Sequence, residues 1–150
     1  MSLPSPIPAP RRAILAVDPG LGGGLAWEGG ALAMPKTDVD ILQAIKCVNP
    51  DEVWVEKIPF GTAGKVGVAA MAKLHGNYGL VRGMVLALGL RLVEVPPKDW
   101  QGHYHLVKGD KTRTEWKNAL KNEAQKRFPK TTVTLATADA LLIYEYACSR

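Results

Sequence analysis

Cysteine is scarce in this chain of 150 residues. The two cysteines, Cys47 and Cys148, form no C-x-x-C pair and have no zinc-ligand spacing to the three histidines. This pattern argues against a zinc-finger fold, and nothing in it indicates an oxidising compartment. Both cysteines lie in apolar helical contexts, so we expect them to be small buried hydrophobic side chains.

Long hydrophobic runs are also absent. The most apolar segment, residues 66–95, is interrupted by Lys73, Arg82 and Arg91 among others, so no stretch has the length needed to cross a membrane. The first residues show no basic region followed by an apolar core, which argues against a signal peptide. We therefore expect a soluble intracellular protein without a membrane partner, located in the cytoplasm and nucleoid or in an organellar matrix.

Acidic residues are outnumbered by basic ones, and the net charge is +5. This balance favours acidic partners, of which nucleic acid is the commonest. An apolar fraction of 47% over 150 residues suffices for one domain with a substantial core. Prolines alternate from Pro4 to Pro10, so we predict a flexible N-terminal segment over 1–12 and a single folded domain over 13–150.

Hydrophobic periodicity predicts the order of the elements. Residues 13–17 form a buried strand that ends at Asp18, and the Pro-Gly and Gly-Gly-Gly turn signals lead into a second strand. Further strands are predicted over 31–34, 52–56 and 90–95. Helices are predicted over 38–48, with Asp38 as N-cap, and over 66–88 and 114–128. A short helix with a basic loop is expected over 98–114, and a final helix starts at Thr137. This order predicts an α/β fold with a mixed five-stranded sheet, a three-strand meander plus parallel strands, flanked by helices on both faces.

The long helix carries glycines at Gly76, Gly79 and Gly83, close to one face. Each costs roughly 0.5–1 kcal/mol relative to alanine in a helix interior, so their presence needs a reason. Close packing of this face on the sheet or on a second subunit would supply one.

Three carboxylates follow a common pattern. Asp18 and Glu56 each end a strand, and on neighbouring parallel strands they would lie roughly 5 Å apart. Taken alone, Asp18 is equally consistent with a cap of its own turn. Asp139 lies in the first turn of the last helix, which packs across the sheet. Such a cluster of oxygen ligands suits Mg²⁺ or Mn²⁺, and two such ions can clamp both oxygens of a phosphodiester displacement.

Three motifs carry a resemblance to a known family: Val17-Asp18-Pro19-Gly20 with its glycines, Trp54-Val55-Glu56, and Thr137-Ala138-Asp139-Ala140-Leu141-Leu142-Ile143. From Ala13 to its C-terminus the chain resembles RuvC-type Holliday-junction resolvases of the ribonuclease H-like fold, nearest to the compact phage, bacterial and chloroplast versions.

The resemblance implies a crossover junction endodeoxyribonuclease of DNA recombination and repair. Such enzymes are homodimers that cut two opposing strands of a four-way DNA junction symmetrically with Mg²⁺ or Mn²⁺. It implies that Asp18, Glu56 and Asp139 are catalytic metal ligands, and that Lys98 and Lys111 lie at the scissile phosphate.

The chain departs from the family at one place. The family usually supplies a fourth carboxylate three or four residues before the last one, where this chain has Ala136 and Leu135. Asp110 or a water would then complete the site, or the chain is a catalytically impaired form that still binds junctions.

Other residues have a functional and a structural interpretation. Phe60 lies in a loop where relatives wedge an aromatic ring against junction bases, and a packing role is about as probable. The further candidates for DNA binding are Lys65, Lys73, Arg82, Lys108 and Arg113, for which a solvated surface is the alternative. For the basic band that includes Lys117 and Lys121 we expect a solvated face that adds salt-dependent attraction to DNA. For Trp100 and Trp116 we expect packing roles.

One further function remains open. A related ribonuclease H-like nuclease would act on ribosomal RNA precursors, but such proteins are usually shorter and lack the long glycine-bearing helix.

Overall fold

The computed structural model describes residues 10–59 and 67–150. Phe60, Lys65 and most of the proline-rich segment lie outside the described residues. Within them, the elements follow one another as the periodicity predicts, with boundaries that shift by one or two residues.

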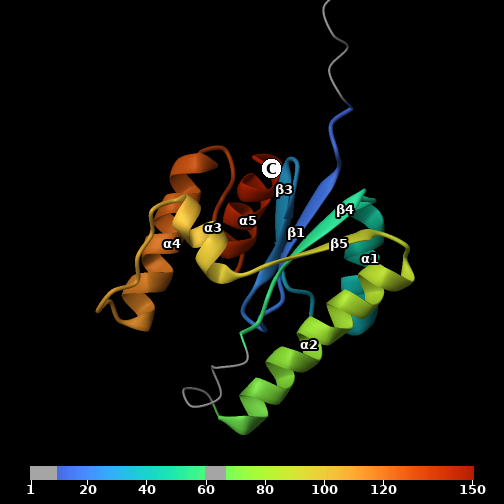
Figure 1. The fold of residues 1–150 in the computed structure, drawn as a ribbon, viewed down its shortest axis with the longest axis horizontal. Coiled ribbons are helices and arrows are strands. Elements are labelled where there is room, and N and C mark those ends of the chain that lie inside the picture. The colour runs from blue at the N-terminus through green and yellow to red at the C-terminus, as the bar shows by residue number, and fades with distance from the viewer. Residues whose placement is uncertain (1–9, 60–66) are drawn as a thin grey trace, which may run out of the picture.

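Five strands form one mixed sheet (Figure 1). They are β1 (Ile14–Asp18), β2 (Gly24–Trp27), β3 (Gly30–Ala33), β4 (Glu52–Glu56) and β5 (Arg91–Val95). The spatial order is β3-β2-β1-β4-β5; the first three strands form an antiparallel meander, and β4 and β5 are added in parallel. The predicted α/β fold with its mixed five-stranded sheet is confirmed.

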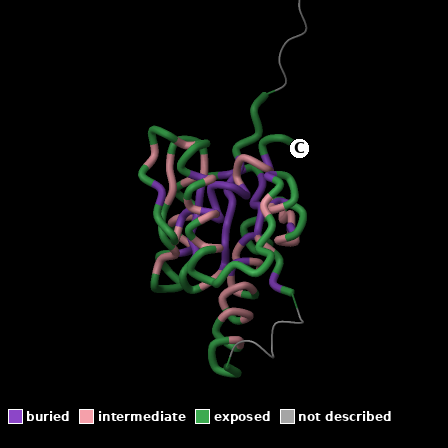
Figure 2. Tube along the Cα trace, turned by 90° about the vertical axis from the view of Figure 1, so that its left-hand side faces the viewer, coloured by how far each residue is buried: buried purple, intermediate pink, exposed green. Residues whose placement is uncertain are grey.

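Helices cover both faces of the sheet (Figure 1). One face carries α1 (Asp38–Val48) and α2 (Val68–Ala87), and the other carries α3 (Pro97–His103), α4 (Arg113–Arg127) and α5 (Ala138–Cys148). Side chains alternate along each strand, so β1 and β4 contribute to both hydrophobic clusters. Figure 2 shows this buried centre running through the sheet.

Two helix starts depend on threonine caps. Thr37, rather than the expected Asp38, is the N-cap of α1, and its hydroxyl accepts a hydrogen bond from the Asp40 N–H at 3.1 Å. The prediction was wrong because Asp38 is itself the first helical residue, where its negative charge interacts favourably with the N-terminal end of the helix dipole. In α4, Thr112 and Glu115 form a reciprocal capping box, so this helix begins at Arg113.

The glycines of α2 do not pack on the sheet. The residues of α2 that are fully buried against it are Val81 and Val85. A Cβ atom built at Gly76, Gly79 or Gly83 would meet no heavy atom within 4 Å, so the first of the two explanations is wrong. Figure 2 shows the start of α2 extending from the buried centre with mostly exposed and intermediate residues.

Cys47 and Cys148 are exposed, which corrects the expectation that they are buried. Each lies in the last turn of a helix, where the chain leaves the core. Among the described helices, none combines the length and the apolar character that a membrane span requires.

Candidate metal centre

Strand alternation directs Asp18 and Glu56 to the same face of the sheet. Each is the last residue of its strand, and the parallel register of β1 and β4 pairs the residues before them, Val17 and Val55. Ala16 lies two residues before Asp18 in the cluster that faces α3, α4 and α5. Because the side-chain period of a strand is two, both carboxylates point toward these helices.

Asp139 approaches the same edge from α5. It is buried, and it lies in the first turn of the helix, where the N-terminal end of the helix dipole favours a negative charge. Thr137, the expected first residue of the helix, is its N-cap, but its hydroxyl accepts from the Thr134 N–H at 3.0 Å and makes no capping bond to α5.

The three carboxylates interact electrostatically. Burial raises the pKa of Glu56 well above its ordinary value, and the charges of Asp18 and Asp139 raise it further. Burial and then the charge of Asp139 raise the pKa of Asp18 to about 6. Carboxylates in such proximity repel one another unless protons or cations neutralise them. The structure thus brings together the three acids that the sequence singled out.

The turn after β1 holds Asp18 closely. The Gly20 N–H donates to Oδ1 of Asp18 at 3.0 Å, and the Gly23 N–H donates to the Gly20 carbonyl at 2.9 Å. A Cβ at Gly23 would lie 2.3 Å from the Asp18 carbonyl oxygen and 2.7 Å from its Cγ, so only glycine fits there. Asp18 is therefore a cap of its own turn and also a member of the acid cluster.

Trp100 orients Glu56. Its indole Nε1 donates to Oε2 of Glu56 at 2.7 Å, and the Trp100 side chain is fully buried in the core. The expected packing role is confirmed, and the hydrogen bond adds a second role. Trp116 is partly buried against the same core, as expected.

Lys117 is the residue of this site that the sequence reasoning missed. Its Nζ lies 2.7 Å from Oδ2 of Asp139, and 37% of its side chain is exposed. Burial lowers the pKa of Lys117, but the charge and hydrogen bond of Asp139, followed by Asp18 and Glu56, raise it overall. The helical spacing held a signal, because Leu120 and Ala124, three and seven residues further on, are the buried positions of α4.

The donor set fits a hard divalent cation. Three carboxylates supply the oxygen ligands that Mg²⁺ and Mn²⁺ prefer. Oδ1 of Asp139 is buried and lacks a hydrogen-bond partner in the described part of the chain, an arrangement that a bound cation would relieve. Among the same residues, no three His, Cys, Asp or Glu side chains are placed so that they could hold a metal ion as they stand, and Lys117 holds the other Asp139 oxygen. Oδ1 of Asp139 is therefore the oxygen open to a cation, and Oδ2 would bind one only after Lys117 releases it.

The two lysines that the resemblance places at the scissile phosphate, Lys98 and Lys111, are not among the charges that shift the pKa values of Asp18 and Glu56. Lys98 is exposed in the first turn of α3. Lys111 is exposed, and its Nζ donates to the Val107 carbonyl of its own loop at 3.3 Å. The cation whose charge lowers the pKa of Asp18 and Glu56 is Lys117.

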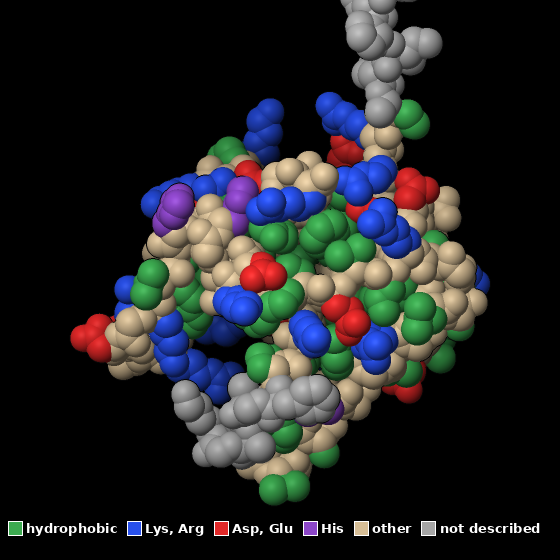
Figure 3. All heavy atoms as spheres, in the orientation of Figure 1, with side chains coloured by type: hydrophobic (Ala, Val, Ile, Leu, Met, Phe, Trp, Pro, Cys, Tyr) green, Lys and Arg blue, Asp and Glu red, His purple; other side chains and the backbone are tan. Residues whose placement is uncertain are grey.

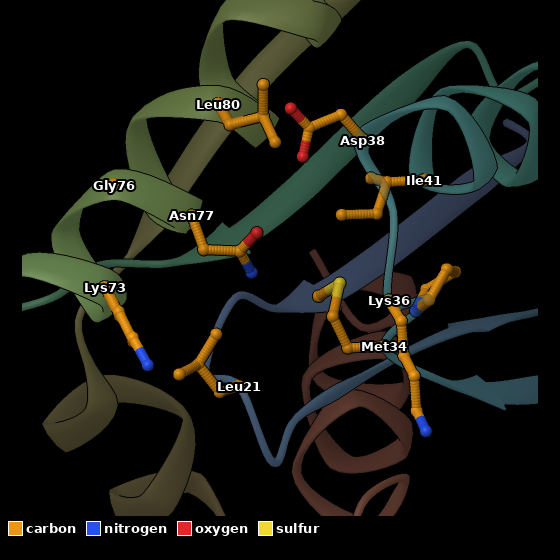
Figure 4. A pocket seen from close by; sticks show the side chains of 10 residues that line it. Leu21, Met34, Lys36, Asp38, Ile41, Lys73, Gly76, Asn77 and Leu80 are labelled. Carbon is orange, nitrogen blue, oxygen red and sulfur yellow. The ribbon is translucent and has the colours of Figure 1, made fainter. Parts of the chain in front are cut away.

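The predicted DNA-binding residues are dispersed over the surface. Arg82 forms an ion pair with Glu94 at 2.8 Å, and its guanidinium lies over the ring of Tyr78. Lys73 lines a cavity of about 530 Å³ between α2 and the start of α1 (Figure 4). Lys108 and Arg113 are exposed before and at the start of α4.

Ala136, the position of the expected fourth acid, lies directly ahead of α5. It is partly buried, and its carbonyl oxygen would be 2.7 Å from a Cβ built at Gly24 of β2. The backbone at Ala136 therefore packs closely on the sheet beside the acid cluster. Asp110, the alternative ligand, is exposed in the loop before α4.

Comparison with solved structures identifies the fold. Thermus thermophilus RuvC superposes with a TM-score of 0.55 at 16% identity, covering 88% of this chain and 90% of that one. T. thermophilus RuvC in complex with a Holliday junction substrate gives a TM-score of 0.58 at 16% identity, covering 92% and 94%. No protein-family model and no curated protein matches the chain. The resemblance seen in the motifs is thus confirmed at the level of the ribonuclease H-like fold of RuvC.

Proposed function

We propose that this protein is a metal-dependent endonuclease that binds four-way DNA junctions and resolves them by symmetric cuts. The observation that carries the proposal is the convergence of Asp18, Glu56 and Asp139, from β1, β4 and α5, on one edge of a RuvC-like sheet. The chain's likeness to a RuvC bound to a Holliday junction substrate supports the choice of DNA substrate.

The residues of the site would have different roles in binding the metal and the phosphate. Asp18, Glu56 and Asp139 would hold Mg²⁺ or Mn²⁺, in a site for one or two ions, and the metal would supply electrophilic activation of the phosphodiester. Trp100 keeps Oε2 of Glu56 in place through its indole N–H. Lys117, once released from Asp139, would place a positive charge where negative charge develops on the phosphate. Lys98 and Lys111 remain candidates for contacts with the scissile strand.

A basic surface supports the DNA partner. Figure 3 shows Lys and Arg side chains gathered over the start of α4, next to a hollow in the surface. The exposed basic residues of this region are Lys108, Lys111 and Arg113. Such charges attract the phosphate backbone regardless of sequence and make binding salt-dependent.

A homodimer belongs to the proposal, because symmetric cutting needs two centres. The free face of α2 is its candidate surface: Gly76, Gly79 and Gly83 face open space, and Val68 and Leu86 expose 88% and 59% of their surface. Exposed apolar side chains on one side of a helix favour cover by a partner, and small residues permit two helices to approach closely. A monomer at micromolar concentration in sedimentation would refute the dimer.

The test compares DNA substrates and metals. In Ca²⁺ the protein should bind a four-way junction in preference to a linear duplex of the same sequence. In Mg²⁺ or Mn²⁺ it should cut the junction. Equal affinity for the two DNAs would contradict the proposal.

A second candidate function is a junction-binding protein that does not cut. Two observations favour it: Ala136 lacks the fourth carboxylate, and Lys117 neutralises Asp139. Binding without cleavage would support this alternative. Ala136→Asp should then restore cleavage, and its failure to do so would show that the missing acid is not the cause.

A further inference from the structure

The position of Asp18 depends on the turn that follows it. Oδ1 of Asp18 accepts from the Gly20 N–H at 3.0 Å, and a further bond from the Gly23 N–H to the Gly20 carbonyl closes the turn. A displacement of Pro19 and Gly20 would therefore also displace the carboxylate.

A side chain of α2 holds this turn. The amide Nδ2 of Asn77 donates to the carbonyl oxygen of Pro19 at 2.6 Å, across 58 positions of sequence. Figure 4 shows Asn77 pointing from α2 toward the segment that follows β1. The bond ends on the residue next to Asp18, so it fixes the distance between α2 and the metal centre.

The surroundings give this bond its importance. Next to Asn77, a cavity of about 530 Å³ opens between α2, the turn and the start of α1. Leu21, the turn residue that lines it, is 60% exposed, and Gly76 of α2 contributes no side chain. Because apolar packing between the turn and α2 is loose here, the hydrogen bond from Asn77 contributes more to holding the turn in place relative to α2.

We infer that Asn77 is a positioning residue for the metal centre, which holds the Pro19 carbonyl so that the Asp18 carboxylate is ready to bind the cation. This inference rests on the metal centre of the proposed function. Residues that orient metal ligands affect metal affinity even though they do not touch the metal.

The test measures Mn²⁺ binding to the full chain without DNA, by isothermal titration calorimetry. Asn77→Leu removes the amide donor, keeps a similar size, adds no charge and favours the helix. We expect its Kd for Mn²⁺ to rise about three- to tenfold, the usual net effect of one hydrogen bond. Asn77→Gln keeps an amide donor beside the cavity and should recover most of the affinity.

Tyr78→Phe is the matched control. The Tyr78 hydroxyl donates to Glu94 on β5, so this variant removes another side-chain hydrogen bond of α2 without touching the turn. Its Mn²⁺ affinity should equal that of the unsubstituted chain. Thermal unfolding of each variant establishes that it is folded.

Three results would overturn the inference. Asn77→Leu could bind Mn²⁺ as tightly as the unsubstituted chain, Tyr78→Phe could lose as much affinity, or Asn77→Gln could show no recovery. If the unsubstituted chain failed to bind Mn²⁺, the metal centre of the proposed function would itself be refuted, and this inference with it.

Discussion

Asp18, Glu56 and Asp139 occupy an environment that penalises their negative charge. All three are buried or nearly so, the charge of Asp139 raises the pKa of Asp18 and of Glu56, and the charge of Asp18 also raises the pKa of Glu56. Lys117 offsets part of this repulsion through its ion pair with Asp139. Without a metal the site is therefore a source of instability, which a divalent cation would relieve.

This charge balance predicts a pH dependence of stability. Burial and the charge of Asp139 raise the pKa of Asp18 from 3.8 to about 6. A raised folded-state pKa contributes stability that is fully present below pH 3.8 and is lost as the pH rises through about 6. Between pH 5 and pH 7.5 the metal-free protein should therefore lose the contribution of this group.

Thermal unfolding with and without Mn²⁺ checks this prediction. Because Mn²⁺ binds the ionised carboxylates, it should raise the Tm more at pH 7.5 than at pH 5. The variant Asp18→Asn should reduce both the pH dependence and the Mn²⁺ effect. Equal Mn²⁺ stabilisation at the two pH values would contradict the assignment.

Lys117 should compete with the metal for Asp139. Its ammonium occupies Oδ2, so Lys117→Met, which keeps much of the stem and removes the charge, should bind Mn²⁺ on the order of tenfold more tightly. Cleavage at saturating metal should decrease, because the positive charge beside the phosphate is lost. Calorimetry and cleavage kinetics separate the two effects.

The control for Lys117 lies on the same helix. Lys121 is one turn further along α4, and its charge does not contribute to the shifted pKa values of Asp18 or Glu56. Lys121→Met should leave Mn²⁺ affinity unchanged. Weaker Mn²⁺ binding by Lys117→Met would mean that the lysine supports the metal centre instead of competing with it.

At the scale of single residues, the predictability of the site follows from periodicity. Asp18 and Glu56 were predictable because a strand alternates its side chains and ends at a definite residue. Lys117 was missed because lysine is mostly solvated, and the inward position of this one depends on the rotation of α4 against α5. That rotation is a property of tertiary packing, which the local sequence does not contain.

Among the elements, α2 has few fully buried residues, and it exposes apolar side chains and glycines on the face turned away from the sheet. Val81 and Val85 are its fully buried residues, and its glycines face open space. The sequence predicted that this face needs an explanation, but could not decide between the sheet and a second subunit. The decision depends on which side of α2 faces β5: the structure excludes close packing of these glycines on the sheet, and the second subunit stays a proposal.

A substitution on this face tests the dimer. Gly79→Glu should weaken dimerisation, because a charged side chain would lie in the close contact between two helices. The isolated chain should become more stable by roughly 0.5–1 kcal/mol, because glutamate favours a helix more than glycine does. Sedimentation measures the association, and chemical unfolding measures the free energy of unfolding.

Gly102→Glu serves as the matched control. Gly102 also lies in a helix, α3, and a Cβ there also meets no atom within 4 Å. This variant should leave dimerisation unchanged. If both variants, or neither, altered association, the free face of α2 would not be the dimer surface.

Other elements were predictable to within a residue or two because their signals are local. Strand β4 alternates and is rich in strand formers. Helix α4 begins with a capping box, Thr112 followed three residues later by Glu115, which is a local sequence pattern. The N-cap of α1 was misplaced because Thr37 and Asp38 are both good caps and adjacent. Backbone geometry decides between them: Thr37 is extended, with ψ at 149°.

For the whole molecule, Figure 1 shows the starts of α4 and α2 near the end of the sheet where β1 and β4 finish, and α2 runs from there along the sheet toward the start of β5. In the proposed function, this arrangement would join a metal centre, a DNA surface and a dimer surface in a chain of 150 residues. Ala136 and Lys117 are the two features that set it apart from a complete four-acid site.

The proposed function depends above all on cleavage of a four-way junction by the acid cluster. The most direct measurement is the mapping of cuts on an end-labelled junction in Mn²⁺, with Asp139→Asn as the paired variant. The proposed function predicts cuts at symmetric positions in two opposing strands, and loss of cutting without loss of junction binding in Asp139→Asn. Junction binding with no cuts by the unsubstituted chain, or cuts that persist in Asp139→Asn, would contradict it.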